Sequence, residues 1–555
     1  MPAKSTVKEK SHYSVLIIGA GINGCGTFRD LCLQGIDCLL VERTDVCSGA
    51  SAAPSRLIHG GIKYLETNEF RLVRESAMER NRLLNNAPHY VKALEVVFPV
   101  NSWFAGLKDG MLGYFGFKAR IKERGALLIE IGLRIYDFYN RKVKALPDHR
   151  FFTKGKLRKE FPAVTHDAVA AGLYYEGRVT HAERLGLELV LDGLVAQPQS
   201  ALRTYTEVEG KPLQGAFTLK DLVTGDTHEV TADVVINASG AWIDKVNGTL
   251  GIASSYMGGS RGAHLIVRHE ALLKATQGRM MYFGCKDGRF NLLYPFFGNV
   301  LVGSTDLSQQ DPDLAHCSSE ETDYLLSVVS EIFPDIILTR DDVILTYSGV
   351  RPLPRANGKD IGDVSRDHSI GRDKLPDTDV PVLSLIGGKW TTFRAFSEQS
   401  SEAVLTLLSK PRSVSTIDLP IGGGRNYPRD AASRNAMVSK IGPRGDALLD
   451  RYGTKALAVQ EYAATTQDRP LSSLPGYSSG EIAYICTHEN VRHLADLLLR
   501  RTAITMEGLL TQDVIQETAK IASDFLGWDK TRTKAEIKHA EAELARRSVK
   551  NVRPA

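Results

Sequence analysis

Residues 15–24 read Val15-Leu16-Ile17-Ile18-Gly19-Ala20-Gly21-Ile22-Asn23-Gly24, a short apolar run followed by three glycines at G-x-G-x-x-G spacing. A helical stretch follows to about Gln34, and a second apolar run, Leu39-Leu40-Val41, ends on Glu42. A strand, a glycine turn, a helix and a second strand closing on an acid make a dinucleotide-binding βαβ unit. Glycine-rich turns alone are weak evidence, but this context favours a dinucleotide site over an ordinary strand–turn–helix.

The glycines and the closing acid each have a distinct mechanical role. Gly19 allows the tight turn, Gly21 lets the backbone approach a pyrophosphate, and Gly24 lets the helix pack closely on the strand. The phosphates then lie at the helix N-terminus, where free N–H groups and the helix dipole favour anions. Glu42 is placed to accept hydrogen bonds from a ribose 2′-hydroxyl and to repel a 2′-phosphate.

Length and composition indicate a multidomain globular protein. At 555 residues the chain exceeds one compact core. Lys and Arg total 69 against 65 for Asp and Glu, which does not suggest nucleic-acid binding. Residues 1–10 are polar and basic, unlike a secretory signal, and we find no apolar run long enough to span a bilayer. The cysteines lack metal-site spacing; Cys25, Cys32, Cys38 and Cys47 are expected to be small buried fillers in a reducing cytosol.

Two further strand-to-helix junctions carry small residues. They are Asn237-Ala238-Ser239-Gly240-Ala241-Trp242 and Gly387-Gly388-Lys389-Trp390-Thr391-Thr392. The serine-rich stretch 48–55 also allows close approach of the backbone to a flat ligand. Thr391 and Thr392 are expected to begin a helix whose positive end favours a reduced flavin. Three such junctions are more than a nicotinamide domain needs, and they predict FAD rather than NAD.

Several distinctive motifs follow one another along the chain: Gly19 to Gly24, Ser55 to Gly61 with Tyr64-Leu65-Glu66, Glu69 to Glu75, Gly303-Ser304-Thr305-Asp306, Tyr347 to Leu353, Ser365-Arg366-Asp367 and Gly387 to Arg394. In these motifs and their order the chain resembles the FAD-dependent glycerol-3-phosphate dehydrogenases over nearly its whole length. The helical tail, with Thr487-His488-Glu489 and Leu497 to Thr502, is similar to the family's C-terminal domain. Several long, chemically distinct motifs in order make the match specific.

Pattern and resemblance together predict an α/β fold, with a Rossmann-like FAD-binding domain of the glutathione-reductase type, a β-rich substrate domain and a C-terminal α-helical domain. The expected boundaries are 12–75 and 166–257 for the FAD-binding domain, 76–165 for a substrate or cap region with a membrane-facing insert at 103–141, 258–350 for the substrate domain, 351–420 for the closing active-site part and 428–546 for the helical domain. The charge-rich end from Lys530 is expected to fray.

Oxidation of a secondary alcohol requires a base for the hydroxyl proton and an acceptor for the hydride. The substrate phosphate needs fixed cations, for which arginine forks are suited. The resemblance places Arg351 and Arg366 on the substrate and makes Lys389 the active-site lysine. His59, just beyond the serine-rich loop, is the first candidate for the base because the unperturbed pKa of a histidine lies near neutrality, and His264 is the second.

The predicted cofactor contacts come from the three junctions and the loop between them: Gly19, Gly21, Gly24, Glu42, Ser51, Ser55, Gly240, Gly388, Thr391 and Thr392. Lys63 and Tyr64 are expected on the substrate side. Lys63 stands where the family commonly has arginine, and lysine keeps the charge but loses the bidentate fork. Phosphate affinity or substrate length can therefore differ here, although a solvated surface lysine also explains Lys63.

The segment from Trp103 to Arg141 combines aromatic side chains, a cationic cluster and a helical stretch at 126–139. It suits a helix in the membrane interface, with a buried helix bearing a basic solvent face as the alternative. Family members that reduce quinone sit on the membrane surface, so the resemblance predicts a peripheral protein on the cytoplasmic side of a membrane. No nucleic-acid or metal partner is predicted, and a homodimer stays open.

The predicted activity is oxidation of sn-glycerol 3-phosphate to dihydroxyacetone phosphate with electrons passed to quinone. Lys63 keeps open another polyol phosphate, such as erythritol phosphate, and an oxygen-using glycerophosphate oxidase is a further alternative. A flavin-binding membrane protein without turnover is disfavoured, because a passive binder does not need a base beside a phosphate clamp.

Overall fold

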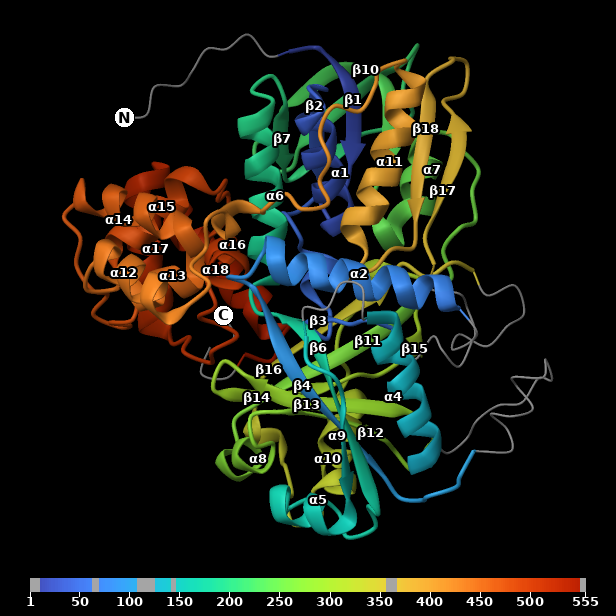
Figure 1. Cartoon of the computed structure of the whole chain (residues 1–555). Helices are drawn as coiled ribbons and strands as arrows, with labels where there is room; N and C mark the ends of the chain where they lie inside the picture. The colour runs from blue at the N-terminus through green and yellow to red at the C-terminus, as the bar shows by residue number, and fades with distance from the viewer. Residues whose placement is uncertain (1–9, 62–68, 107–124, 141–145, 356–366, 550–555) are drawn as a thin grey trace.

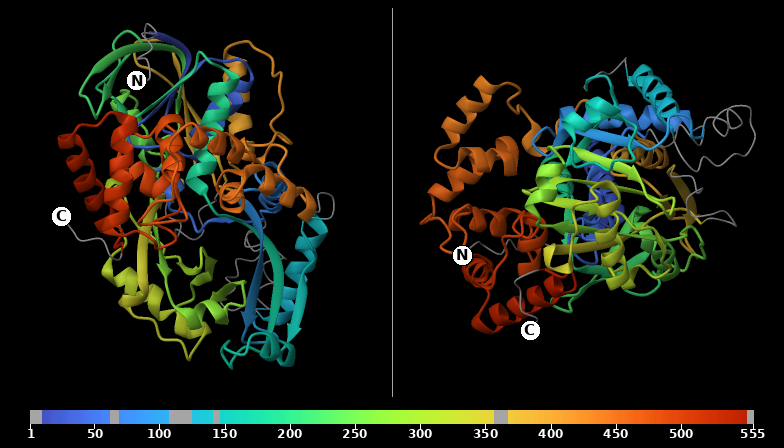
Figure 2. Two further views of the ribbon diagram at one scale, coloured as in Figure 1. Left: turned by 90° about the vertical axis from the view of Figure 1, so that its left-hand side faces the viewer. Right: turned by 90° about the horizontal axis from the view of Figure 1, so that it is seen from below.

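The computed structural model describes residues 10–61, 69–106, 125–140, 146–355 and 367–549. Within them, two β-sheets form the body of the molecule, the dinucleotide sheet lying above the second sheet in Figure 1. The C-terminal helices form a separate group beside both sheets, and the side view in Figure 2 shows them packed along the same flank. The architecture is thus a mixed α/β fold with a C-terminal helical domain.

The dinucleotide sheet has the strand order β17-β18-β10-β1-β2-β7. Its strands are β1 (His12–Ile18), β2 (Cys38–Glu42), β7 (Ala201–Thr204), β10 (Thr227–Asn237), β17 (Ser369–Lys374) and β18 (Pro381–Ile386). The strands from β18 to β7 run parallel, whereas β17 is antiparallel to β18. The hairpin of β8 (Thr206–Val208) and β9 (Ala216–Asp221) extends from β10.

Helices cover the dinucleotide sheet because its parallel strands are apolar on both faces. On one face, α1 (Ile22–Leu33) lies between α6 (Ala182–Ala196) and α11 (Phe393–Leu407). Phe28 of α1 is fully buried in this layer. The four cysteines of the unit are also buried and unpaired by disulfides, as expected for small apolar fillers.

The second sheet has the strand order β15-β11-β14-β13-β12-β4-β6-β3, with β16 on β11 and β5 on β6. Its strands are β3 (Leu57–Ile58), β4 (Val91–Val100), β5 (Arg150–Thr153), β6 (Ala170–Val179), β11 (Ser260–Val267), β12 (Met280–Gly284), β13 (Phe290–Phe296), β14 (Asn299–Gly303), β15 (Leu307–Ser308) and β16 (Val343–Arg351). The β-rich region predicted from the sequence is therefore completed by β4, which comes from the region expected to be a cap, and by β6, which comes from the region expected to be the second part of the FAD-binding domain.

The remaining helices lie around the two sheets or form the C-terminal group. Around the sheets lie α2 (Phe70–Asn86), α4 (Ala126–Asn140), α5 (Lys154–Glu160), α7 (Ile243–Thr249), α8 (Glu270–Ala275), α9 (Ser319–Ser327) and α10 (Val329–Ile332). The C-terminal helices are α12 (Ala431–Ile441), α13 (Gly445–Tyr452), α14 (Ala456–Ala464), α15 (Ser479–His488), α16 (Leu494–Asp496), α17 (Gln512–Leu526) and α18 (Lys530–Ala545). None of the described helices combines the length and apolar character needed to cross a bilayer.

Buried ion pairs fasten the C-terminal helices to the dinucleotide unit. Arg501 reaches Asp45, just beyond β2, at 2.7 Å, and Arg184 of α6 reaches Glu489 at 2.7 Å. All four side chains are nearly inaccessible to solvent. Removal of Asp45 or Glu489 would leave a buried arginine without its carboxylate, so these pairs hold the two parts in one arrangement.

The expectation that the chain frays from Lys530 is wrong. Residues from Lys530 form α18, which Asp529 caps by accepting the Arg532 N–H at 2.7 Å. Its buried residues, Glu536, Ala540 and Leu544, recur every four positions, so one face docks on the domain. The high charge marks the solvent side of a packed helix.

Candidate active site

A cavity of about 1020 Å³ lies where the two sheets meet. Its lining includes the carboxyl ends of β1, β2 and β10, the junction after β18, and residues of β11 and β16 from the second sheet. Ligands of open α/β sheets bind at the carboxyl ends of the strands, where this cavity lies. Its volume is at the upper end of the roughly 300–1,000 Å³ usual for ligand sites, which suits a long ligand.

The N-terminus of α1 opens toward this cavity. Gly21 is its N-cap and makes no side-chain capping bond, while the Ile22 N–H is donated to Ser51 Oγ at 2.9 Å. Gly19 has a φ of 105° and no room for a side chain, since a Cβ there would lie 2.8 Å from the Ala238 carbonyl carbon. A Cβ on Gly24 would lie 1.9 Å from the Gly19 oxygen. No side chain of the turn therefore stands between the N-terminus of α1 and an anion that approaches it.

Glu42, at the end of β2, is held by backbone donors. Its carboxylate accepts the Ala20 N–H at 2.8 Å and the Thr44 N–H at 2.9 Å. Burial raises the pKa of Glu42, against the hydrogen bonds from Thr44 and Ala20. Oε1 also accepts the Thr44 hydroxyl at 3.0 Å, but Oε2 keeps a further lone pair, so Glu42, which lines the cavity, can still accept from a ribose hydroxyl.

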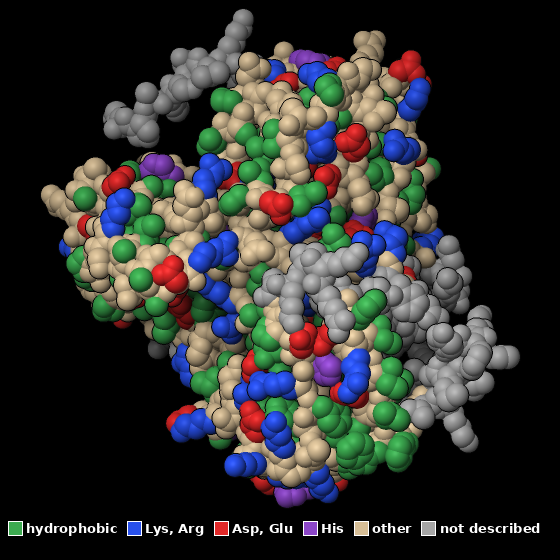
Figure 3. Space-filling model, viewed as in Figure 1, with side chains coloured by type: hydrophobic (Ala, Val, Ile, Leu, Met, Phe, Trp, Pro, Cys, Tyr) green, Lys and Arg blue, Asp and Glu red, His purple; other side chains and the backbone are tan. Residues whose placement is uncertain are grey.

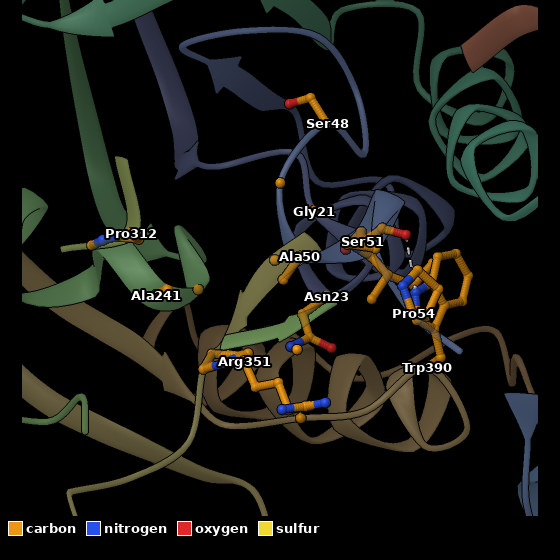
Figure 4. A pocket seen from close by; sticks show the side chains of 18 of the residues that line it. Gly21, Asn23, Ser48, Ala50, Ser51, Pro54, Ala241, Pro312, Arg351 and Trp390 are labelled. Carbon is orange, nitrogen blue, oxygen red and sulfur yellow. Dashed lines mark hydrogen bonds between the residues drawn. The ribbon is translucent and has the colours of Figure 1, made fainter. Parts of the chain in front are cut away.

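The third junction is joined to the first by hydrogen bonds over long sequence distances. Trp390 Nε1 donates to the Ser51 carbonyl at 3.2 Å, and Asn23 Nδ2 donates to the Gly387 carbonyl at 3.2 Å. The His59 N–H is donated to Thr391 Oγ1 at 3.1 Å. Figure 4 shows Asn23, Ser51 and Trp390 around the same hollow. The junction before α11 thus borders the cavity directly beside the loop that carries His59.

His264 lies on β11 in a tight polar setting. Its Nε2 is 2.8 Å from Ser55 Oγ, and its ring stacks on that of Tyr347 with centroids 5.0 Å apart. Burial, and next the positive charge of Arg351, lower the pKa of His264 to about 3. The imidazole is therefore neutral at physiological pH. His59 is half-buried at the cavity wall, after β3.

Arg351, at the end of β16, is aimed by the loop that follows β14. Nη1 lies 3.1 Å from both Asp306 Oδ1 and Ser260 Oγ, and Nη2 lies 3.1 Å from the Thr305 carbonyl oxygen. Gly262 makes room for the fork, because a Cβ there would lie 2.0 Å from Nη2. The side chain is 27% exposed and borders the cavity, with its charge fixed in direction (Figure 4).

The structure brings most of the predicted site residues to the cavity wall. Those that line it are Gly19, Gly21, Glu42, Ser51, Ser55, His59, Gly240, His264, Arg351, Gly388, Lys389 and Thr391. Gly24 and Thr392 are not among the lining residues; Thr392 is the N-cap of α11. Lys63, Tyr64 and Arg366 lie outside the described residues.

The lining residues that were not predicted include Asn23, Glu176, Asp306 and Trp390. Asn23 and Trp390 lie within the glycine junctions, and Asp306 belongs to the motif Gly303-Ser304-Thr305-Asp306, so each had a signal in the sequence. Glu176 is one acid within strand β6, and nothing in the local pattern distinguishes it from an exposed strand residue.

The site fits FAD. One continuous cavity connects the N-terminus of α1, which suits phosphates, to the beginning of α11, which suits a flavin. Asn23 Oδ1 is buried at this wall and has no hydrogen-bond partner among the described residues, so it is available to a ligand. The glycines at 19, 21 and 388 keep side chains out of the path.

Comparisons with known proteins agree with this fit. The model of a family described as FAD dependent oxidoreductase matches residues 14–374, and that of the C-terminal domain of alpha-glycerophosphate oxidase matches residues 414–533. A glycerol-3-phosphate dehydrogenase of Synechocystis sp. is 32% identical, over 95% of this chain and 96% of the relative. An aerobic glycerol-3-phosphate dehydrogenase of Staphylococcus epidermidis is 27% identical, over 98% of this chain and 96% of the relative.

A solved structure shares the fold along nearly the entire chain. The glycerol-3-phosphate dehydrogenase of Bacillus halodurans, complexed with FAD, superposes with a TM-score of 0.76 at 22% identity, covering 98% of this chain and 96% of that one. The fold matches along the same length as the sequence relatives. The chain is an FAD-binding protein that belongs to the FAD-dependent oxidoreductases and, within them, to the glycerol-3-phosphate dehydrogenase family.

Proposed function

We propose that the protein oxidises sn-glycerol 3-phosphate to dihydroxyacetone phosphate and passes the electrons to quinone. The observation that carries this proposal is that His59, His264, Arg351 and Lys389 line the cavity that also receives the N-terminus of α1. A base and phosphate-binding cations thus border one space with a dinucleotide site. The names of the relatives support the substrate.

Arg351 and Lys389 bind the substrate phosphate and the developing oxyanion. Arg351 is suited to the phosphate because Asp306 and the Thr305 carbonyl hold its planar fork in one orientation before substrate arrives. Lys389 follows the glycine pair at the third junction and brings a compact charge to the same cavity. Bound FAD supplies the acceptor for the hydride that leaves C2.

His59 removes the hydroxyl proton. His264 is the weaker candidate because a base whose pKa is about 3 has little affinity for a proton at neutral pH, and its Nε2 is already engaged by Ser55 Oγ. We assign His264 the role of a neutral hydrogen-bonding group at the substrate. The loop from Ser51 to His59 is held by Trp390 and Thr391, so the base has a fixed place on the wall.

The exposed side of α4 supports binding to a membrane surface, where a quinone is dissolved. Leu127, Ile131, Ile135 and Phe138 recur along one side of this helix, and Phe138 is 65% exposed. Figure 3 shows hydrophobic side chains gathered at the lower right, over α4. The exposed side of α4 is mainly apolar, which favours this hypothesis over a helix with a basic solvent face. The basic residues of the predicted insert within 107–124 lie outside the described residues.

A paired assay of substrate and acceptor tests the proposal. Purified FAD enzyme receives sn-glycerol 3-phosphate or erythritol 4-phosphate, with either a soluble quinone analogue or oxygen. We expect turnover of the first substrate with the quinone analogue and slow formation of hydrogen peroxide with oxygen. Preference for erythritol 4-phosphate contradicts the substrate, and fast peroxide formation contradicts the acceptor.

A further inference from the structure

We propose that Glu176 is a positioning residue that fixes the loop of His59 by binding the Gly60 N–H. The inference rests on the proposed role of His59 as the base. Glu176 is 2% exposed, and its Oε2 accepts the Gly60 N–H at 2.7 Å. Because this amide belongs to the residue that follows His59, its place constrains the backbone from which the imidazole projects.

The strand that precedes His59 is too short to hold the loop by strand pairing alone, so the hydrogen bond from Gly60 to Glu176 is needed. β3 pairs with β6 only through Leu57 and Ile58, and the chain leaves the sheet at His59. Ile58 faces Gly177, so the Glu176 side chain is next to the end of the strand. The His59 N–H is donated to Thr391 Oγ1 at 3.1 Å, and the Gly60 N–H to Glu176. Two consecutive amides are therefore held, one by the third junction and one by the second sheet.

Two buried side chains orient the carboxylate. Arg80 Nη1 of α2 donates to Glu176 Oε2 at 3.0 Å, and the Tyr136 hydroxyl of α4 donates to Oε1 at 3.1 Å. Arg80 is 1% exposed and Tyr136 is 2% exposed. With Gly60 on one side and this pair on the other, the carboxylate has partners for both oxygens, as a buried charge requires.

Gly60 lies directly beside Arg80 and Tyr136, the two side chains that bind Glu176. A Cβ at this position would lie 1.8 Å from the Tyr136 hydroxyl and 2.8 Å from Arg80 Nη1. Glu176 also lines the cavity, as His59 and Tyr174 do. A carboxylate that only supported the core would not need to reach the wall of the active-site cavity, whereas one that sets the His59 loop must lie there.

Glu176→Asp is the main test, because it keeps the charge beside Arg80 but withdraws the carboxylate from Gly60. Small displacements of a catalytic group lower turnover strongly, and we expect kcat to fall by roughly 10- to 100-fold with KM changed less than about threefold. Glu176→Gln keeps both the length and an acceptor for Gly60 and is expected to retain more kcat than Glu176→Asp. All values are taken per bound FAD.

Glu188→Asp is the matched control. Glu188 is 1% exposed, accepts the Gly423 N–H at 3.1 Å and is not among the lining residues of the cavity. Shortening this carboxylate withdraws it from a glycine amide in the same way, but at the joint with the C-terminal domain. We expect its kcat per bound FAD to equal that of the wild type.

A double-mutant cycle separates positioning from general destabilisation. If Glu176 acts through His59, Glu176→Asp has little further effect on kcat in a His59→Ala background. Additive losses, or an unchanged kcat in Glu176→Asp, overturn the inference. If Glu176→Asp does not fold, Glu176→Gln is used in the same cycle. Additive losses of kcat with His59→Ala would then overturn the inference in the same way. Absence of wild-type turnover contradicts the proposed function itself and removes the basis of the inference.

Discussion

The indole N–H of Trp390 binds the carbonyl of Ser51 at 3.2 Å across 339 residues of sequence. Ser51 in turn accepts the first free N–H of α1 through its hydroxyl at 2.9 Å. The phosphate-binding turn and the flavin-facing junction are therefore parts of one hydrogen-bonded unit. A substitution at either end of this unit is expected to alter the other end as well. FAD content and substrate kinetics must therefore both be measured for each variant.

Arg351 is expected to contribute to substrate binding. Arg351→Ala should raise KM strongly, because it removes an oriented positive charge from the substrate phosphate. The increase should correspond to about 2–4 kcal/mol of lost binding free energy. Arg351→Lys is the matched variant; it keeps the charge without the fork that Asp306 and Thr305 hold, and should give an intermediate KM. Steady-state kinetics at fixed FAD content provide both values. A KM equal to that of the wild type in the alanine variant would exclude this role.

Substitutions of His59 and His264 are expected to change different kinetic constants. His59→Ala should lower kcat by roughly 100-fold or more, since it removes the base. His264→Asn should mainly raise KM, because His264 is neutral and acts as a hydrogen-bonding group. Comparison of kcat and KM in the two variants measures the difference. Near-normal kcat without His59 would transfer the base to His264 or to water.

The low pKa of His264 predicts an acid-dependent loss of stability. In the unfolded chain a histidine titrates near 6.5, whereas in the folded state its pKa is about 3. Between these values the unfolded state binds the extra proton, so stability falls as the pH decreases, by up to about 1.4 kcal/mol per pH unit. His264→Asn should remove this contribution. The Tm of His264→Asn relative to that of the wild type should rise as the pH is lowered from 6.5 to 4.5. A Tm difference that does not change with pH would contradict this role of His264.

A surface cluster is expected to retain the cofactor. Asp313, from the second sheet's side, accepts from Trp242 Nε1 at 2.8 Å and pairs with Arg43 at 2.6 Å and Lys245 at 2.7 Å, and all four line the cavity. Partial burial opposes these contacts, but together they lower the pKa of Asp313. Exposed pairs are weak, so Asp313→Asn should speed FAD release by roughly fivefold, an effect that high salt reproduces in the wild type.

Fluorescence of released FAD after dilution provides the rate. Asp379→Asn is the control, because Asp379 forms a similar exposed pair with Lys374 at 2.9 Å and does not line the cavity. Equal rates of release in Asp313→Asn and Asp379→Asn would mean that the cluster does not hold the cofactor.

The apolar side of α4 is expected to be the membrane-binding face. Ile131→Glu with Ile135→Glu should reduce co-sedimentation with anionic lipid vesicles at least about tenfold, because charged side chains there oppose insertion into the interface. Turnover with a soluble quinone analogue should stay at the wild-type level. Ile337→Glu changes an isoleucine away from α4 that is even more exposed, 76% accessible, and should not affect sedimentation. Unimpaired vesicle binding in the double variant would assign attachment to another surface.

Local sequence patterns predicted the parts of the site that depend on backbone geometry. Gly19 and Gly388 mark places where the chain must turn without a Cβ, and such places have a fixed residue type. The helix beginning after Thr392 was also evident from the sequence. Long-range hydrogen bonds had no such signal. Glu176 meets Gly60 only because β6 pairs with β3, and sequence spacing does not report that pairing.

The error at α18 has a related cause. Its charge suggested a fraying end, but the face that docks needs only three buried positions at helical spacing, and one of them, Glu536, is itself an acid. Glu536 is buried because it accepts the Leu494 N–H at 2.9 Å and bonds His493, contacts made by the fold rather than by neighbours in sequence. Composition alone therefore does not reveal that such a helix is ordered and docked on the domain.

Anaerobic titration of the FAD-loaded protein with sn-glycerol 3-phosphate tests most directly whether the cavity joins a flavin to a phosphate clamp. The visible absorbance of the oxidised flavin should bleach stoichiometrically, and Arg351→Ala should require a much higher substrate concentration for the same bleaching. An absorbance that stays constant at saturating sn-glycerol 3-phosphate, in a protein with full FAD content, would contradict the proposed reaction.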